Sequence, residues 1–342
     1  RAELTVTFAA LKPGLLLGEG PERCGRVEVA DIGLPVDRAR AFLVDDGDVA
    51  RLRPARPRDA HKWQSAVYVV AGSPGMLGAA TMSSRGAARA GAGMVRLGVP
   101  GATPGELPVS EVVSRALAAG GFEDEVLSAL ERCRALVLGP GLGRSEPVEG
   151  SVLELLARSA QVPAVVDADG LSALGSAERA AAVVAERSKA NPSPAPLVLT
   201  PHAGEYRALA GRPVGDDPLE ASRDLAQRSG CVVLLKGSTT VVAEPGGRAL
   251  FAAAGSARLA TAGTGDVLSG MIGAFLARGT GEGRAEQGSP EQGALAAALA
   301  AHVHGRAAGL GFRDGLLAGD LPELVAAWLS GEVVPETEGG RC

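Results

Sequence analysis

The stretch Ala135-Leu136-Val137-Leu138-Gly139-Pro140-Gly141-Leu142-Gly143 joins an apolar run of strand length to a turn rich in glycine. A continuous apolar run that ends at glycine is typical of a strand buried on both faces of a parallel sheet. Similar runs recur along residues 65–242, and five of them lead directly into turns with glycine or charged residues. The runs are Ser65–Ala71, Met94–Val99, Ala135–Leu138, Ala164–Val166, Leu197–Leu199, Val232–Leu235 and Thr239–Val242.

Longer alanine-rich patterns with helical spacing separate these runs. Strands that alternate with helices predict a largely parallel central sheet with helices on both faces. The predicted fold class is therefore α/β, in a three-layer α/β/α arrangement. Ligands of such sheets bind beyond the carboxyl ends of the strands, so we expect a functional site in the turns that follow the runs.

The composition argues against several classes of partner. The chain has 342 residues, a formal net charge of −5 and no block of Lys or Arg, so neither nucleic acid nor a membrane is an expected partner. Aromatic residues make up only 3%, which leaves few side chains to stack on bases. The cysteines and histidines are scattered without metal-ligand spacing. With no signal peptide and no membrane-spanning run, the expected location is the reducing cytoplasm.

Gly263-Thr264-Gly265-Asp266, followed at once by the helical pattern Val267–Leu276, is the strongest indication of catalysis. Free amides at a helix N-terminus bind phosphate. A carboxylate beside them can take a proton from a hydroxyl while the amides hold charge on a transferring phosphoryl group. This pairing argues for phosphorylation of a small-molecule hydroxyl. The alternative is an ordinary helix start with glycine in a tight loop.

Two other turns carry carboxylates. Asp167 and Asp169 follow a buried run, where they could hold Mg²⁺ through water or cap the helix that begins near Leu171. Capping is the preferred interpretation for one of them. Farther on, His202 is a plausible hydrogen-bond partner for substrate, and Glu205 could act through metal-bound water or simply favour the start of a helix.

Two further turns suit phosphate chemistry. Lys236-Gly237-Ser238-Thr239-Thr240 places a cation and hydroxyls at a strand end, where Lys can neutralise nucleotide phosphates; a solvated surface Lys is the alternative. The Gly139–Gly143 turn allows close approach of a ligand or of another backbone, or is only a tight turn. It is neither a Walker A loop nor a dinucleotide fingerprint.

The chain is expected to divide into four segments. Residues 1–36 contain two β-like stretches, which are too short to bury a core. Residues 37–62 have the charged, Pro-broken composition of a linker. The main domain covers 63–330, with a surface loop at 281–292 before a helix at Ala294–Ala308, and a tail follows at 331–342.

Residues 65 to about 330 resemble the ADP-dependent NAD(P)H-hydrate dehydratase family, within the ribokinase-like carbohydrate-kinase superfamily. Seven motifs in family order carry the likeness: Ala71-Gly72-Ser73 with Gly78-Ala79-Ala80, Ala90–Arg96, Gly139–Gly143, Asp167–Leu171, Thr200–Glu205, Lys236-Gly237 and Thr261–Leu268. Residues 1–36 resemble the tail of an NAD(P)H-hydrate epimerase domain. The body of that domain is absent, so we expect no epimerase activity.

The resemblance implies a repair reaction. NADH or NADPH can become hydrated on its nicotinamide ring, and the family phosphorylates the ring hydroxyl of the S epimer with ADP. Elimination of phosphate then restores NAD(P)H and leaves AMP and phosphate. The implied substrates are NAD(P)H hydrate and ADP, with Mg²⁺ bridging the phosphates, and ATP remains an open alternative as donor. An alanine-rich helix face would suit association, so a homo-oligomer is expected.

The resemblance also implies roles for individual residues. Asp266 deprotonates the hydroxyl, and the hydrate pocket is lined by Ala79, Gly143, His202 and Asp266. The nucleotide is held by Lys236, Gly237, Ser238, Thr239, Thr240 and Gly265. The transferred phosphoryl group is steadied by the amides of Ala262, Gly263, Thr264 and Gly265. Glu205 would contact the metal through water.

Two rival functions remain at this stage. A vitamin-pathway kinase of the same fold would phosphorylate a hydroxymethyl group on a heterocycle, normally with ATP. An inactive nucleotide-binding remnant is the second rival, although a binding protein has no need of a base at Asp266.

Overall fold

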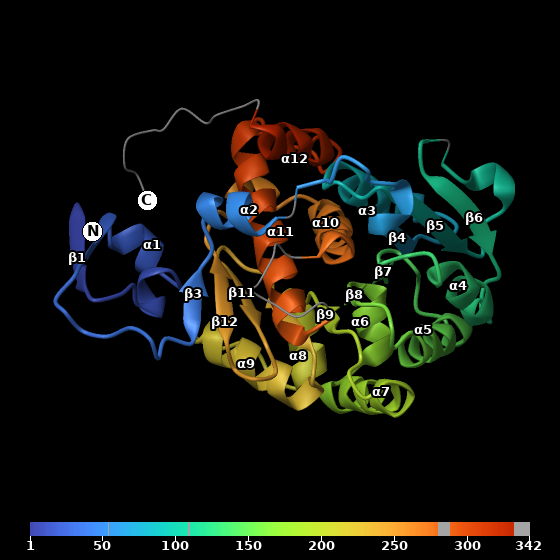
Figure 1. The fold of residues 1–342 in the computed structure, drawn as a ribbon, viewed down its shortest axis with the longest axis horizontal. Helices are drawn as coiled ribbons and strands as arrows, with labels where there is room; N and C mark the ends of the chain where they lie inside the picture. Colours follow the sequence, from blue (N-terminus) through green and yellow to red (C-terminus); the bar gives the residue numbers. More distant parts are fainter. Residues whose placement is uncertain (54, 109, 280–287, 332–342) are drawn as a thin grey trace.

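The computed structural model describes residues 1–53, 55–108, 110–279 and 288–331 (Figure 1). A ten-stranded sheet crosses the molecule in the order β3-β12-β11-β10-β9-β8-β7-β4-β5-β6. Its strands are β3 (Ala41–Leu43), β4 (Ala66–Val70), β5 (Met94–Pro100), β6 (Val113–Leu117), β7 (Ala135–Leu138), β8 (Ala164–Val166), β9 (Leu197–Leu199), β10 (Val232–Leu235), β11 (Thr240–Ala243) and β12 (Ala249–Ala252).

All seven predicted strands are present in this sheet. Strands β4 to β10 pair in parallel, and only the pairs β10–β11 and β11–β12 are antiparallel. The α/β fold class, with its largely parallel sheet, is therefore confirmed. Three strands were not predicted, namely β3, β6 and β12. Strand β6 was not predicted because it is a half-exposed edge strand with the mixed sequence Val-Ser-Arg-Ala-Leu.

Helices cover both faces of the sheet (Figure 1). One layer contains α2 (Asp46–Leu52), α3 (Leu77–Arg89), α10 (Thr264–Arg278), α11 (Pro290–Leu310) and α12 (Leu321–Ser330). The other contains α4 (Glu123–Leu130), α5 (Glu146–Arg158), α6 (Asp169–Leu174), α7 (Ala177–Ala190), α8 (Ala203–Ala210) and α9 (Pro218–Ser229). Short 3-10 turns occur at Pro13–Leu15, Lys62–Ser65, Pro104–Glu106 and Ala257–Leu259.

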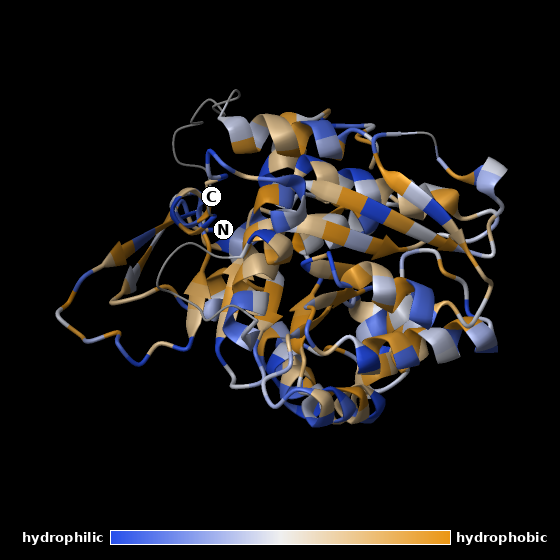
Figure 2. Ribbon diagram, turned by 45° about the vertical axis from the view of Figure 1, so that its right-hand side comes forward, coloured by the Kyte–Doolittle hydropathy of each residue, from blue (hydrophilic) through white to orange (hydrophobic). Residues whose placement is uncertain are grey.

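Alternation along β4 explains why the strands are apolar throughout. Val67 and Val69 belong to the core beneath α10 and α11, whereas Ala66, Tyr68 and Val70 belong to the core on the opposite face. Every residue of this strand is buried. The central strands accordingly appear almost uniformly hydrophobic in Figure 2, as expected for a sheet that is covered on both sides.

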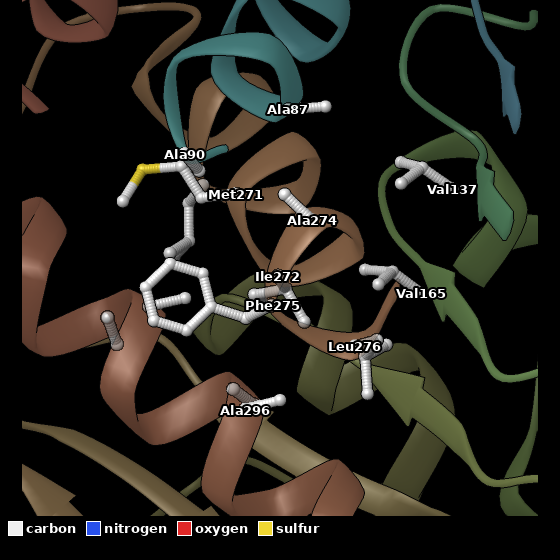
Figure 3. Close-up of a cluster of buried hydrophobic side chains, with 14 of the residues drawn as sticks. Ala87, Ala90, Val137, Val165, Met271, Ile272, Ala274, Phe275, Leu276 and Ala296 are labelled. Atoms are coloured by element: carbon white, nitrogen blue, oxygen red, sulfur yellow. The ribbon is translucent and has the colours of Figure 1, made fainter. Parts of the chain in front are cut away.

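Helix α10 lies at the centre of its layer, between the sheet, α3 and α11 (Figure 3). A Cβ added at Gly270 would lie 1.9 Å from the carbonyl oxygen of Ser83 on α3, and one added at Gly86 would lie 2.3 Å from that of Val267. Both glycines therefore permit backbone contact between the two helices. This contact fixes the N-terminal turn of α10, which contains Asp266, against α3.

The order of the parallel strands reverses between β4 and β7. Chain segments after β4 add β5 and β6 on one side, and segments after β7 add β8, β9 and β10 on the other. Such a switch point leaves a crevice at the carboxyl ends of the two strands, where ligands bind. The turns Gly72–Gly75 and Gly139–Gly143 follow β4 and β7, so they flank this crevice.

The N-terminal residues form a separate small unit at the edge of the molecule (Figure 1). Strands β1 (Leu4–Phe8) and β2 (Arg26–Ala30) pair in parallel, and α1 (Gly20–Arg23) lies between them in sequence. Phe8 is 59% exposed on this small sheet. The unit nevertheless contacts the main sheet, because Leu16 and Leu17 pack against buried residues of β11 and β12.

Residues 37–62 differ from the linker that was expected. Strand β3 pairs in parallel with β12 at the edge of the central sheet. Helix α2 buries Val49 and Leu52 in the core with α11. These two elements were not predicted from the charged, Pro-rich sequence. A three-residue strand and a seven-residue helix are too short to give a clear hydrophobic periodicity.

Two expectations fall partly on residues outside the description. The predicted loop at 281–292 overlaps residues 280–287, and α11 begins at Pro290 rather than at Ala294. Of the predicted tail, only Gly331 is described. Within the described ranges no helix is long and apolar enough to cross a membrane.

Candidate active site

Asp266 lies in the first turn of α10, which begins at Thr264 rather than at Val267. Gly263 precedes the helix with φ of 92°, a left-handed conformation that favours glycine. The Thr264 hydroxyl donates to the carbonyl oxygens of Leu259 and Thr261, at 2.8 and 3.0 Å, and so holds the preceding turn. The sequence Gly-Thr-Gly-Asp therefore builds a tight entry into a helix, with an acid in its first turn.

The Asp266 carboxyl has a strongly altered pKa. Burial raises this pKa to about 7 from an ordinary value of 3.8, and the charges of Asp167, Asp169 and Glu205 add to the increase. Lys236 opposes it. A carboxylate with a pKa near neutrality is well matched to take a proton from a hydroxyl, because a general base acts best when its pKa lies near the working pH.

Lys236 joins several elements of the site. Its Nζ lies 2.8 Å from Asp167 Oδ1 and 3.8 Å from Glu205 Oε2. A Cβ added at Gly265 would lie 3.6 Å from the same Nζ, so the ammonium group reaches the first turn of α10. Burial alone would lower the pKa of Lys236, but the neighbouring carboxylates raise it overall. Lys236 therefore stays charged and is not a solvated surface residue.

His202 and Glu205 form a reciprocal cap at the N-terminus of α8. His202 Nδ1 accepts from the amides of Gly204 and Glu205, at 2.9 and 3.3 Å, and Glu205 Oε2 accepts from the amide of His202 at 2.8 Å. Because Nδ1 is an acceptor, the ring proton of neutral His202 lies on Nε2. The His202 side chain is 60% exposed, and its Nε2 lies 3.6 Å from Glu205 Oε2.

A cavity of about 390 Å³ lies beside the N-terminus of α10. Its lining includes five residues predicted to bind nucleotide: Lys236, Gly237, Ser238, Thr240 and Gly265. Ala252, Leu259, Leu268 and Ala301 provide an apolar wall. The cavity thus combines a charged and hydroxyl-bearing end with an apolar end, which suits a nucleotide.

Two groups that were predicted to bind the nucleotide or the phosphoryl group have protein partners in the structure. Thr239 is not among the residues that line this cavity, and its hydroxyl donates to the carbonyl oxygen of Leu16 at 2.7 Å. The Thr264 amide, predicted for the anion hole, lies 3.4 Å from the carbonyl oxygen of Thr261. The first of these contacts ties the N-terminal unit to the turn after β10.

The predicted acceptor residues Ala79 and Gly143 belong to neighbouring segments. A Cβ added at Gly141 would lie 2.9 Å from Ala79 Cβ, so the turn after β7 lies directly against α3. The Gly143 amide donates to Asp169 Oδ2 at 2.9 Å. Gly143 has φ of 79°, and a Cβ placed there would meet no atom within 4 Å. Gly143 is therefore required for its backbone conformation rather than for lack of space.

The expectation that Asp167 or Asp169 caps α6 is wrong. Among the described residues no side chain caps this helix, and Ala168 occupies the N-cap position. Asp167 is only 2% exposed and faces Lys236, whereas Asp169 is the first residue of α6 and faces Gly143 and Arg144. Both carboxylates instead bind groups on other segments of the chain.

Two further polar residues of the site had escaped sequence reasoning. The Ser269 hydroxyl donates to Asp167 Oδ2 at 2.6 Å, and its position three residues after Asp266 on a helix was the available signal. His304 lines the cavity beside Lys236 and Thr264, where burial lowers its pKa to about 4. His304 is therefore neutral.

The carboxylates suit a hydrated magnesium ion better than a closed metal cage. The described residues contain no group of three or more His, Cys, Asp or Glu side chains placed to hold a metal. Mg²⁺ usually keeps several waters and binds through one or two carboxylates together with substrate phosphates. Glu205, whose carboxylate lies 3.8 Å from Lys236 Nζ, fits such an outer role.

Known proteins are similar in sequence to this chain over most of its length. Residues 67–328 match the NAD(P)H-hydrate dehydratase family model. The chain is 40% identical over 328 residues to the bifunctional NAD(P)H-hydrate repair enzyme Nnr of Salinibacter ruber, covering 90% of this chain and 57% of that protein. It is 42% identical over 287 residues to Nnr of Mycobacterium tuberculosis H37Rv, covering 83% and 55%. The chain thus spans just over half the length of these relatives.

Solved structures give the same picture. The Bacillus subtilis ADP/ATP-dependent NAD(P)H-hydrate dehydratase, co-crystallised with ATP and Mg²⁺, superposes with a TM-score of 0.66 at 27% identity, covering 86% of this chain and 99% of that one. A ribokinase-like superfamily protein of Enterococcus faecalis gives 0.68 at 20% identity, covering 88% and 100%, which supports the fold alone. With a family match over most of its length and relatives at about 40% identity, this chain belongs to the NAD(P)H-hydrate dehydratase family.

Proposed function

We propose that this chain repairs hydrated nicotinamide nucleotides, by ADP-dependent dehydration of (6S)-NAD(P)H hydrate to NAD(P)H with release of AMP and phosphate. The observation that carries the proposal is the Asp266 carboxyl, with a pKa of about 7, at the start of α10 and beside a cavity that contains Lys236. Family membership supplies the identity of the acceptor.

The proposed chemistry has two stages. Asp266 takes the proton of the ring hydroxyl, whose oxygen then bonds to the β-phosphorus of ADP as the bond from that phosphorus to AMP breaks. The phosphorylated carbon next loses phosphate, while the adjacent ring carbon loses a proton, and the ring double bond returns. The first stage needs a base and an anion-stabilising site, which Asp266 and the first turn of α10 supply.

Nucleotide binding falls to the residues of the 390 Å³ cavity. Lys236 would neutralise phosphate charge, and the amides of Ala262, Gly263 and Gly265 would contact the transferring group. Mg²⁺, held on the phosphates with Glu205 acting through water, would neutralise charge that develops on the phosphoryl oxygens. His202 would donate from Nε2 to the hydrate.

The family match favours the dehydratase over a vitamin-pathway kinase. An inactive remnant is disfavoured because the base, the cation and the nucleotide cavity occur together. ADP is the proposed donor, and ATP is the alternative to be tested, since the Bacillus relative is named for both nucleotides.

Other parts of the proposal concern the whole chain. Residues 1–36 would be the end of an epimerase domain. Cys24, Cys133 and Cys231 are free and buried, which is consistent with a reducing cytoplasm. We also propose that the protein forms a homo-oligomer, which light scattering of the purified chain would test.

The direct test is absorbance in the reduced-nicotinamide band, with NADH hydrate, Mg²⁺ and either ADP or ATP. Growth of the band with ADP, together with formation of AMP, supports the proposal. Growth with ATP alone would preserve the reaction and change the donor. Absence of growth with either nucleotide, from a chain that binds both, would overturn it.

Asp266→Asn tests the proposed base. This variant should bind ADP normally and lose about 10²-fold or more in turnover, because proton transfer by a positioned base contributes that much. Asp124→Asn is a matched control, since Asp124 is an 82% exposed carboxylate on α4. Near-normal turnover by Asp266→Asn would exclude Asp266 as the base.

A further inference from the structure

The turn between β8 and α6 has an unusual backbone. Ala168 adopts φ of 48° and ψ of −117°, and the Gly170 amide donates to the carbonyl oxygen of Asp167 at 2.9 Å. Ala168 thus has the dihedral angles of the first central position of a type II′ turn, which normally requires glycine. A residue with a side chain persists there only when the surrounding structure dictates the conformation.

Packing around the turn explains how this conformation is maintained. A Cβ added at Gly139 would lie 1.9 Å from the carbonyl oxygen of Asp167, and one added at Gly170 would lie 2.9 Å from that of Leu138. The turn is therefore in backbone contact with the end of β7. Because the chain reverses at Ala168, the carboxylates on either side of it reach different parts of the site.

Asp167 belongs to the nucleotide side. Its Oδ1 lies 2.8 Å from Lys236 Nζ, and its Oδ2 accepts from the Ser269 hydroxyl at 2.6 Å. Lys236 lines the nucleotide cavity, and Ser269 lies on α10 one turn after Asp266. Both oxygens of Asp167 are thus engaged, one by a residue that lines the nucleotide cavity and the other by a residue of α10.

Asp169 belongs to the acceptor side. Its Oδ2 accepts from the Gly143 amide at 2.9 Å, and its Oδ1 accepts from Arg144 Nε at 2.9 Å. The carboxylate therefore holds the end of the Gly139–Gly143 turn through hydrogen bonds, and this turn lies against Ala79. Since the Gly143 amide is already used, Gly143 can offer a substrate only its carbonyl and its bare Cα.

We propose that the strained turn divides positioning between two carboxylates: Asp167 fixes Lys236 for the nucleotide, and Asp169 fixes the Gly139–Gly143 turn for the hydroxyl acceptor. The identity of the two sides rests on the function proposed above. Neither carboxylate touches substrate in this scheme. Each acts through the group that it holds, so the two should affect different kinetic constants.

The test compares Asp167→Asn with Asp169→Ala, using Asp124→Asn as the control. Titration calorimetry measures the Kd for ADP, fluorescence measures the Kd for NADH, and absorbance gives KM and kcat for NADH hydrate. Asp167→Asn should raise the Kd for ADP about tenfold and lower kcat, with NADH binding changed less than about twofold. Asp169→Ala should raise the KM for hydrate and the Kd for NADH about tenfold, with ADP binding changed less than about twofold.

Two further readouts separate positioning from general damage. Asp169→Asn keeps an oxygen that can accept from the Gly143 amide, so it should restore most of the affinity for NADH. Asp167→Asn should also shift the pH–rate profile to lower pH, because the charge of Asp167 raises the pKa of Asp266. If Asp169→Ala does not fold, Asp169→Ser serves instead, since a serine hydroxyl is too short to replace the carboxylate.

The inference fails if both variants shift both affinities equally, or if neither shifts any. A wild-type chain that forms no NADH from the hydrate would overturn the proposed function instead. In that event the ADP and NADH affinities still decide whether the two carboxylates serve separate sides.

Discussion

Asp266 is an acid in the first turn of a helix, a position where the helix dipole normally lowers the pKa of a carboxyl group. Here burial raises the pKa of Asp266 to about 7, and the charge of Asp167 adds to the effect. The ionised form is therefore less favourable in the folded protein than in the unfolded chain. Such a residue trades stability for activity.

This raised pKa predicts how stability depends on pH. Below about pH 4 the carboxyl is protonated in both states and contributes nothing. As pH rises from about 4 to about 7 the unfolded chain loses its proton first, so wild-type stability falls, and above about 7 the loss stays constant. Asp266→Asn removes this loss. The free energy of unfolding of the variant, measured with urea, should exceed that of wild type at pH 8. At pH 4 the difference should be much smaller.

The same pKa predicts the pH–rate profile. A general base must be ionised to accept a proton, so the role proposed for Asp266 predicts that kcat/KM for NADH hydrate rises with pH and reaches half its maximum near pH 7. Steady-state rates between pH 5 and 9 would check this. A profile that is flat across this range would mean that ionisation of Asp266 does not limit the reaction.

Thr239 and Thr240 are adjacent threonines with different surroundings. Thr240 lines the nucleotide cavity, whereas the hydroxyl of Thr239 binds the carbonyl oxygen of Leu16. Thr239→Val should cost about 1 kcal/mol of stability and leave the Kd for ADP unchanged. Calorimetry of unfolding and of ADP binding would test both statements. A large loss of ADP affinity would show that Thr239 contributes to nucleotide binding after all.

At the scale of elements, α10 and α3 depend on glycine for their close contact. Gly270→Ala would place Cβ 1.9 Å from the carbonyl oxygen of Ser83, so the helices must separate. We expect a loss of about 2 kcal/mol or more, despite the higher helix propensity of alanine. Activity should fall as well, because the separation displaces the turn that contains Asp266.

Gly150 provides the matched control for that substitution. It lies within α5, is exposed, and has no atom within 4 Å of an added Cβ. Gly150→Ala should therefore stabilise the protein by about 0.5–1 kcal/mol without changing activity. Thermal unfolding of the two variants measures the contrast. Equal effects at both positions would show that helix propensity, rather than backbone contact, decides the outcome.

At the scale of the whole molecule, the main domain begins before residue 63. Strand β3 pairs with β12, and α2 buries Val49 and Leu52. A chain that starts at residue 37 should therefore unfold cooperatively and retain activity. A chain that starts at residue 63 loses these contacts and should be several kcal/mol less stable, because each buried Val or Leu contributes about 1.5–3 kcal/mol. Urea unfolding of both chains would decide where the domain begins.

The sequence by itself determined the architecture and indicated where the candidate site lies. Uniformly apolar runs can only be satisfied between two helical layers, so the seven central strands followed from composition and spacing alone. Glycine and charged residues after those runs indicated the edge of the sheet at which the candidate site residues meet, and Gly263–Asp266 indicated the helix with the candidate base. Short or half-exposed elements such as β3 and β6 gave no such pattern.

Tertiary structure alone decided how the polar groups of the site are paired. Asp167 and Asp169 have the same local sequence signal, yet one binds Lys236, 69 residues away, and the other binds the Gly143 amide, 26 residues away in the opposite direction along the chain. The raised pKa of Asp266 likewise depends on burial and on charges from separate turns and helices. Electrostatic and hydrogen-bond partners are set by distance in space, and a linear pattern carries that distance only within one helix, strand or turn.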